Sequence, residues 1–215
     1  MNSYELLKTI SYPATERYTD RGSKFYAYAY PVMEIKHIEK AITEVTKKSP
    51  GATHYCYAWR FDPFSIKEFS QDDGEPSGTA GSPILGVLKS ASLINVLVVV
   101  ARFFGGTKLG KSGLIQAYRE SANRVITNTR TINLQRYVPV TITYPYQCES
   151  HIQELIYKFD LQKGKEIYTD YVTMTLYCEN SYAAEFLPIL DHLAHLGIKY
   201  ESSDECFRPV DKKNI

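Results

Sequence analysis

The amino-acid sequence predicts a protein of the α+β class with two domains, and three observations lead to this prediction. The chain has 215 residues, which suits one large or two small domains. Strand and helix patterns change their arrangement beyond about Asn133. The charge also changes sign: residues 1–137 hold 18 Lys and Arg against 12 Asp and Glu, whereas residues 138–215 hold 7 against 12.

The composition excludes several classes of protein. Hydrophobic residues make up 44% and charged residues 23%, close to globular averages, so extended disorder, collagen and coiled coil are not expected. The longest apolar run, Val96–Ala101, is too short to span a membrane. The first five residues lack the features of a secretory signal, and the four cysteines form no C-x-x-C pair. We expect a soluble, cytoplasmic protein with reduced thiols, no membrane partner, no cofactor and no metal site.

The first predicted elements are a strand, a helix and a second strand. Aromatic and small residues alternate from Phe25 to Val32, as in a strand. Apolar residues then recur at helical spacing up to the stop at Ser49-Pro50-Gly51. The second strand, Thr53–Phe61, places Tyr55, Tyr57 and Trp59 on one face and His54, Cys56 and Ala58 on the other.

A short helix, a buried strand and a longer helix follow in the prediction. Ser82-Pro83 reads as an N-cap with proline at the first helical position. Ile94–Phe103 is a continuous apolar strand, and a glycine-rich loop, residues 105–113, leads to an amphipathic helix. The apolar stripe of that helix consists of Leu114, Tyr118, Ala122, Val125 and Ile126.

Beyond Asn133 the predicted order is strand, helix, two strands, helix and strand. The segments are 137–144, 149–159, a strand near Ile167, 171–178, 182–196 and 199–203. This order is that of the ferredoxin-like fold, with two helices on one sheet. We therefore predict domains at 1–133 and 134–215.

The first candidate site is the acidic segment from Asp72 to Pro83. Asp72, Asp73 and Glu75 lie within four residues and could hold a hard cation or transfer protons, and His54 is a further weak catalytic candidate. The helix start at Ser82 would offer free N–H groups to an anion. The alternative is a tight Pro/Gly turn with solvated carboxylates. Ser77 lacks the G-x-S-x-G context of a nucleophile.

The second candidate site is the glycine cluster between the apolar strand and the longer helix. Residues 105–112 satisfy G-x-x-x-x-G-K-S, the phosphate-binding loop of P-loop NTPases. That architecture requires a parallel sheet and an aspartate ending a second apolar strand, and no such strand follows. We therefore expect not nucleotide hydrolysis but a phosphate site, formed by open N–H groups beside Lys108 and Lys111.

The residues around this loop are basic. Seven Lys and Arg and a single acid, Glu120, lie between Arg102 and Arg136, which suggests an anion-binding face that includes Arg102 and Arg119. The alternative is a solvated basic helix balanced by the acidic stretch 62–75. Tyrosines such as Tyr26 and Tyr28 could stack on bases, although alternating strand tyrosines are more often half-buried.

Three segments together resemble the YigZ/IMPACT family. They are A-T-H-Y-C-Y-A-W-R at 52–60, D-D-G-E-P-S-G-T-A-G-S-P at 72–83 and V-V-A-R-F-F-G-G-T-K-L-G at 99–110. The motif positions occur here as His54, Asp72, Asp73, Glu75, Ser77, Thr79, Arg102, Gly105, Gly106, Lys108 and Gly110. Two departures are Phe104 for the usual tyrosine and Lys111-Ser112 for small residues, and the second creates the P-loop appearance.

The resemblance implies a fold and a field of activity. The first domain would be like the second domain of ribosomal protein S5 and the fourth domain of elongation factor G. The second would be ferredoxin-like, as is the fifth domain of that factor. These likenesses point to the ribosome. The eukaryotic relatives regulate translation by opposing activation of the kinase that senses uncharged tRNA.

These observations lead to one main hypothesis and one alternative. We expect a translation-associated regulator, rather than an enzyme, that binds structured RNA or the ribosome but not DNA. The contact residues would be Arg102, Gly105, Gly106, Lys108, Gly110, Lys111, Ser112 and Arg119, with Ser77 and Thr79 in the neighbouring loop. The alternative is an enzyme or binding protein for a small phosphorylated or nucleotide ligand, in which residues 72–75 serve a metal or a proton transfer. A third alternative is a protein-interaction module with a protein partner.

Overall fold

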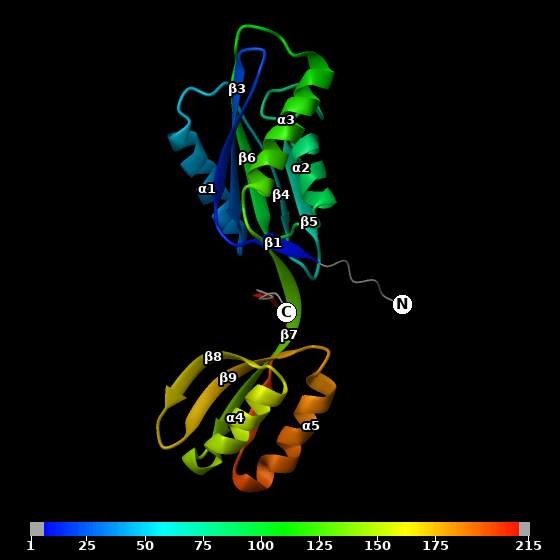
Figure 1. Ribbon diagram of the computed structural model, residues 1–215. Helices are drawn as coiled ribbons and strands as arrows, with labels where there is room; N and C mark the ends of the chain where they lie inside the picture. The colour runs from blue at the N-terminus through cyan, green and yellow to red at the C-terminus, as the bar shows by residue number, and fades with distance from the viewer. Residues whose placement is uncertain (1–6, 211–215) are drawn as a thin grey trace. The chain divides into compact units, whose positions relative to one another are not determined.

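The computed structural model describes residues 7–210, which form two compact units. The first extends to Leu134 and takes in Pro209 and Val210, and the second is Gln135–Arg208. The division predicted after Asn133 falls within one continuous strand, β7 (Thr131–Tyr144), which begins in the first unit and continues into the second (Figure 1). The assignment of Pro209 and Val210 to the first unit was not predicted. Both units combine helices with antiparallel sheets.

The first unit is built on a five-stranded sheet in which every neighbouring pair is antiparallel. Its order is β2 (Ala14–Asp20), β3 (Ser23–Pro31), β6 (Val96–Phe103), β4 (His54–Phe61) and β5 (Lys67–Gln71). The apolar strand β6 lies at the centre and is buried on both faces, which explains its continuous run of hydrophobic residues. A short strand, β1 (Lys8–Ile10), pairs with the beginning of β7.

Helices cover both faces of this sheet (Figure 1). Helix α1 (Ile35–Lys48) packs Ile38, Ala41 and Val45 on one face, over Tyr28 and Leu97. Helices α2 (Gly81–Ser90) and α3 (Gly110–Thr127) pack on the other face. The strand alternation therefore decides which side chains meet which helices: Phe25, Cys56 and Val100 face α2 and α3.

Some elements of the first unit differ from the sequence prediction. The edge strands β2 and β5 were not predicted, because their residues are mostly polar, none of them is fully buried, and they carry no clear apolar pattern. Helix α2 begins at Gly81 with Ala80 at the N-cap, whereas Ser82 was the predicted cap. The Ala80 side chain makes no cap hydrogen bond, and the missing acceptor comes from Asp72, outside the helix.

The second unit contains the predicted order of elements with one further strand. After β7 come α4 (Glu149–Lys158), β8 (Gln162–Tyr168), β9 (Val172–Glu179), α5 (Ala183–Leu193), β10 (Lys199–Ser202) and the unpredicted β11 (Cys206–Val210). Short 3-10 turns, Tyr146–Cys148 and Ala194–Leu196, precede α4 and follow α5. The strands lie in the order β10-β7-β9-β8, all antiparallel, and β11 also pairs with β7.

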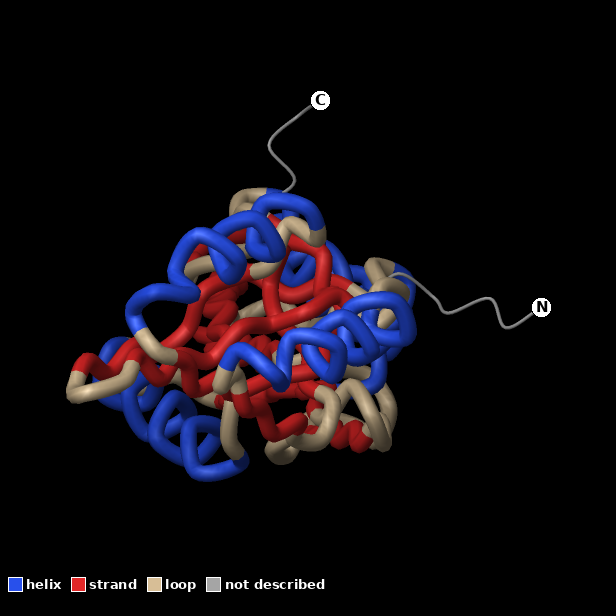
Figure 2. The backbone as a smooth tube through the Cα atoms, turned by 90° about the horizontal axis from the view of Figure 1, so that it is seen from below, coloured by secondary structure: helices blue, strands red, loops and turns tan. Residues whose placement is uncertain are grey.

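The two faces of the second sheet differ in character. One face packs Ile142 and Leu176 against Ile152 of α4 and Phe186 of α5, the two helices labelled beside this sheet in Figure 1. Figure 2 draws all helices as blue tubes and all strands as red ones. On the other face threonines of β7 and β9 form cross-strand pairs, Thr141 with Thr175 and Thr143 with Thr173.

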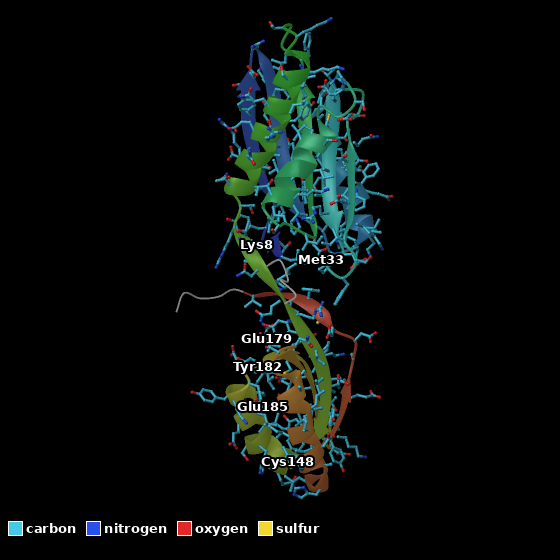
Figure 3. All side chains as sticks on the ribbon, turned by 90° about the vertical axis from the view of Figure 1, so that its right-hand side faces the viewer. Lys8, Met33, Cys148, Glu179, Tyr182 and Glu185 are labelled. Carbon is cyan, nitrogen blue, oxygen red and sulfur yellow. The ribbon has the colours of Figure 1, made fainter. Side chains whose placement is uncertain are left out.

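The turn between β9 and α5 is closed by local contacts (Figure 3). The Tyr182 N–H donates to the Glu179 carbonyl at 2.9 Å, and the Tyr182 ring lies 6.5 Å from the Phe159 ring. Glu185 pairs with Lys158 of α4 at 3.3 Å. These contacts join the start of α5 to the end of α4. Across residues 7–210, none of the helices combines the length and apolar character that crossing a membrane requires.

Candidate functional site

The acidic loop, residues 72–80, is fastened to α2 by the Asp72 carboxylate. Asp72 Oδ2 accepts the Gly78 N–H at 2.8 Å, and Oδ1 accepts those of Ala80 at 3.0 Å and Gly81 at 2.8 Å. Burial alone would raise the pKa of Asp72, but these three donors outweigh it and the pKa lies below its ordinary value. The amides of Ala80 and Gly81, at the start of α2, are thus occupied by Asp72 and are not available to an external anion.

Asp73 fastens the same loop to β4. Its Oδ2 accepts the Tyr55 N–H at 2.6 Å, and its carbonyl oxygen lies 2.7 Å from His54 Nδ1. Because a carbonyl oxygen can only accept, Nδ1 of His54 carries the proton. Nε2 of the ring then faces Glu75 Oε1 at 4.0 Å, and the His54 side chain remains 22% exposed.

Glu75 and Arg102 form a buried ion pair beneath the loop. Arg102 Nη1 lies 2.5 Å from Glu75 Oε1, and the two side chains are only 6% and 4% exposed. The Tyr118 hydroxyl of α3 donates to the same carboxylate oxygen at 2.8 Å. The Arg102 guanidinium also lies 5.5 Å from the Phe25 ring centroid and contacts the Ser23 hydroxyl at 3.4 Å. A charged pair this deep is tolerated because both charges have partners.

Cys56 completes the cluster from β4. Its Sγ lies 2.9 Å from the Asp72 carbonyl oxygen and 3.2 Å from the Tyr118 hydroxyl. Burial raises the pKa of the Cys56 thiol to about 12, and burial likewise raises the pKa of Tyr118. The thiol therefore stays protonated at neutral pH and is not an activated nucleophile.

We call His54, Cys56, Glu75, Arg102 and Tyr118 the buried polar cluster. It joins β4, the acidic loop, β6 and α3. The catalytic candidates Asp72, Asp73 and Glu75 all have hydrogen-bonding partners within the protein, and within residues 7–210 no group of three or more His, Cys, Asp or Glu side chains could hold a metal ion. Through these contacts the acidic loop has a structural role: it connects α2 and α3 to the ends of β4 and β6.

In the second candidate loop, Gly105 packs closely against a neighbouring turn, whereas the space around Gly106 is open. A Cβ atom at Gly105 would lie 1.9 Å from the Gly22 carbonyl carbon, so only glycine fits against the β2–β3 turn. Gly106 has a φ of +85° and Gly110 a φ of +70°, a conformation that favours glycine. Leu109, which is 6% exposed, anchors the far end in the core. We call residues 104–109 with the first turn of α3 the basic glycine loop; it lies at the upper end of the first unit in Figure 1.

The backbone amides of this loop differ in their availability. Those of Phe104 and Gly105 donate to the hydroxyls of Thr53 and Ser23, each at 3.3 Å, so the predicted contact at Gly105 is occupied. Among the hydrogen bonds of the described residues, none has the amide of Gly106, Thr107, Lys108 or Leu109 as donor. The side chains of Lys108 and Lys111 are exposed, and neither forms an ion pair within the part of the chain described. Helix α3 starts at Gly110 without a side-chain cap, so its first N–H groups also lack acceptors.

The remaining site residues fall into exposed and buried positions. Ser112 and Arg119, seven residues apart on α3, are exposed on one side of the helix. Ser77 is exposed, whereas Thr79 is buried and its hydroxyl donates to the Pro76 carbonyl at 2.6 Å. Arg102 was predicted as a phosphate contact, but it is buried and paired with Glu75, so it is not on the surface with the lysines.

The loop does not have the setting of a P-loop NTPase. Strand β6, which precedes it, pairs antiparallel with both of its neighbours, β3 and β4. The nucleotide-hydrolysing fold requires a parallel sheet at this position. The G-x-x-x-x-G-K-S spacing is therefore present without the architecture that gives it that function.

The structure also shows two features that the sequence reasoning missed. Arg102, at the end of β6, pairs with Glu75, so the acidic loop and the basic glycine loop lie at the same end of the sheet. Tyr118 was assigned to an apolar stripe, yet its hydroxyl is the link between α3 and the cluster. The sequence did contain a signal for this link. Tyr118 places a hydroxyl on the core-facing side of the helix, and a buried hydroxyl needs a hydrogen-bond partner.

The fold and the site define a two-unit α+β protein whose first unit carries an exposed basic loop above a buried ion pair. A model of the Impact N-terminal domain matches residues 21–126, the segment that contains both loops and the cluster. The IMPACT family member YigZ of Escherichia coli is 39% identical over 145 residues, 64% of this chain and 67% of that protein. The chain belongs to the IMPACT family.

Two further comparisons extend this result. The rat (Rattus norvegicus) Protein IMPACT is 38% identical over 97 residues, which cover 43% of this chain and 30% of that protein. A solved structure titled "Crystal structure of an hypothetical protein" has a TM-score of 0.63 and 25% identity, covering 93% of this chain and 98% of that one. The similarity of fold therefore extends over both units, whereas the rat protein matches a shorter segment.

Proposed function

We propose that this protein is a cytoplasmic, translation-associated regulator that binds structured RNA or the ribosome through the basic glycine loop and the exposed side of α3. Its membership of the IMPACT family supports the link to translation. The observation that carries the proposal is the group of unoccupied amides at Gly106–Leu109 beside the exposed Lys108 and Lys111.

The chemistry of the loop suits phosphate oxygens. Backbone N–H groups and ammonium groups both donate to negatively charged oxygens, and the positive end of a helix dipole adds to this at Gly110. Such contacts recognise the nucleic-acid backbone and position it, but they read no base sequence. The proposal therefore predicts binding that depends on RNA shape and on ionic strength.

We also infer more specific domain types than the α+β class. The order β10-β7-β9-β8, with two helices on one face, supports a ferredoxin-like second unit. For the first unit, the family resemblance supports a domain like the second domain of ribosomal protein S5. Both types occur in ribosome-associated proteins according to that resemblance, which agrees with the proposed partner.

The test is a salt titration of binding to ribosomes and to a folded tRNA. Lys108→Ala and Lys111→Ala should each weaken binding and lower the slope of log K against log salt by about one, because each removes one phosphate contact. Fluorescence anisotropy at several salt concentrations measures both quantities.

The matched control is Lys40→Ala, which removes the same charge from an exposed position on α1. It should retain the wild-type affinity and slope. If Lys108→Ala and Lys111→Ala bind as the wild type does at every salt concentration, the loop is not the contact and the proposal fails.

A further inference from the structure

A cavity of about 380 Å³ opens on the α1 face of the first sheet, opposite the buried polar cluster. Its lining includes Lys24, Tyr26, Lys48, Ser49 and Phe103. Strand alternation separates the two sites: Phe25 and Arg102 face α2 and α3, whereas Lys24, Tyr26 and Phe103 face the side of α1.

The cavity exists because α1 ends before the sheet does. Along β3, exposure on this face increases toward the strand start, from buried Tyr28 through half-buried Tyr26 to exposed Lys24. Helix α1 covers Tyr28 and stops at Lys48, so the end of the sheet beyond it is uncovered. Aromatic side chains are thus left open to solvent at the edge of the cavity.

The wall next to the helix end is held by hydrogen bonds. The Tyr28 and Ser49 hydroxyls lie 2.8 Å apart, and the Tyr55 hydroxyl donates to the Ser49 carbonyl at 2.6 Å. Ser49 itself is 4% exposed. This wall is therefore a fixed surface at the junction of α1 and the sheet.

The rim of the cavity is cationic. Lys24 is exposed and forms no ion pair within residues 7–210, and the Arg17 guanidinium lies 5.7 Å from the Tyr26 ring centroid. Lys48 pairs with Glu44 at 2.6 Å, and both are partly exposed. The cationic residues that line the cavity are Lys24 and Lys48, and Arg17 lies nearby against Tyr26. Together with the single Glu44 carboxylate they leave a net positive charge, which favours an anionic ligand.

Aromatic rings form the other half of the site. The Tyr26 and Phe103 rings meet edge to face, with centroids 5.7 Å apart and an interplanar angle of 83°. Both residues are half-buried, so part of each ring borders the cavity. Aromatic faces beside cations are the usual means of holding a base and its phosphate without reading the sequence.

We propose that this cavity binds a nucleotide, with the base against Phe103 or Tyr26 and the phosphate at Lys24 and Lys48. The inference deepens the proposed RNA contact and rests on it, because Phe103 immediately precedes the basic glycine loop and pairs with Lys24 across the sheet. An unpaired nucleotide of an RNA bound at the loop would enter the cavity from the same end of the sheet.

Two kinds of substitution separate the two halves of the site. Lys24→Ala should weaken binding of a labelled single-stranded RNA decamer and lower the salt slope by about one. Phe103→Leu should weaken it by about fivefold or more without changing the slope, because it removes stacking but no charge. Lys40→Ala is the control for charge, and thermal unfolding by circular dichroism checks that Phe103→Leu is folded.

A second arm identifies the source of the nucleotide. Adenosine monophosphate, adenosine and inorganic phosphate are titrated separately while the protein is observed by NMR. Saturable shifts with the monophosphate that are lost in Lys24→Ala support a free nucleotide as the ligand. Binding of the decamer alone, weakened in both cavity variants, supports a nucleotide within RNA.

The failures of the two proposals are distinguishable. If Lys108→Ala weakens ribosome binding but Lys24→Ala and Phe103→Leu leave the decamer and the monophosphate unaffected, the cavity proposal is overturned and the loop proposal stands. If the cavity variants weaken binding and the loop variants do not, the loop proposal fails instead. Absence of binding to every RNA and nucleotide overturns both.

Discussion

At the scale of single residues, the Glu75 carboxylate neutralises a guanidinium that the fold has almost removed from water. Arg102 is 5% exposed, and its Nε has no hydrogen-bond partner in the described structure. The hydrogen bonds to Glu75 and Ser23 therefore offset most of the cost of removing the guanidinium from water. A buried charge that loses its partner costs far more than the pair contributes. The acidic loop is thus positioned by the Glu75–Arg102 ion pair, and a substitution of either residue should destabilise the protein.

We predict that Glu75→Gln lowers the free energy of unfolding by about 3 kcal/mol, because a neutral amide leaves the Arg102 charge buried and uncompensated. Urea unfolding at pH 7 measures the loss. Glu39→Gln, at an exposed position of α1, is the control and should change stability by less than about 0.5 kcal/mol. Equal losses in the two variants would contradict the structural role assigned to Glu75.

At the scale of elements, Asp72 acts as the cap that α2 does not supply for itself. The donors at Gly78, Ala80 and Gly81 hold the pKa of Asp72 below its ordinary value despite burial. A carboxyl whose pKa is lowered by folding stabilises the protein above its unfolded pKa, about 3.9. That stabilisation is lost as the pH falls through the lower, folded pKa.

We therefore predict that Asp72→Asn costs about 1 kcal/mol at pH 7, in the range of a lost helix cap. The difference from the wild type should shrink as the pH falls below about 4. Urea unfolding across this pH range measures it, with Asp204→Asn, an exposed position, as the control. A difference that grows in acid would refute the assigned protonation state.

Two glycines of the first unit should respond to alanine with opposite signs. Gly86 is exposed within α2 with nothing within 4 Å of an added Cβ, so Gly86→Ala should stabilise by about 0.5–1 kcal/mol. At Gly105 the added Cβ would lie 1.9 Å from the Gly22 carbonyl carbon, so Gly105→Ala should destabilise by about 2 kcal/mol or more. Urea midpoints measure both, and changes of the same sign would contradict the described packing.

At the scale of the whole molecule, the two units have separate hydrophobic cores. No buried residue of the described chain belongs to both the cluster around Phe25 and the cluster around Phe186. The single tryptophan, Trp59, lies on β4 of the first unit, so its fluorescence reports on that unit. Far-ultraviolet circular dichroism reports on the helices of both.

From this separation we predict that Phe186→Ala destabilises the second unit by about 3 kcal/mol, since Phe186 is 0% exposed. The unfolding transition seen by circular dichroism should move to lower urea, while the Trp59 transition moves less. Gly86→Ala, in the first unit, is the comparison variant: it should shift the Trp59 transition, to higher urea, more than it shifts the unfolding of the second unit. If Phe186→Ala shifts both probes equally, the units unfold as one and the prediction is wrong.

Much of the local structure could be predicted because burial leaves a periodic pattern. The apolar run of β6, the alternation of β4 and the stripe of α3 all come from elements packed on one or both faces. The edge strands β2 and β5 could not be predicted in this way, since none of their residues is fully buried and most are polar. The glycine-rich segments were recognised as loops, but the close approach of Gly105 to Gly22 could not be foreseen.

The sequence alone determined the class of fold, the family resemblance and the concentration of glycine and charge in two loops, because periodicity, composition and ordered motifs are local properties. Only the tertiary structure decided which charges remain available. Folding buried Arg102 against Glu75 and engaged Asp72 with backbone donors, while it left Lys108, Lys111 and Lys24 exposed. The physical reason is that the role of a charged group depends on its solvation and partners, and most of those partners come from residues distant in the chain.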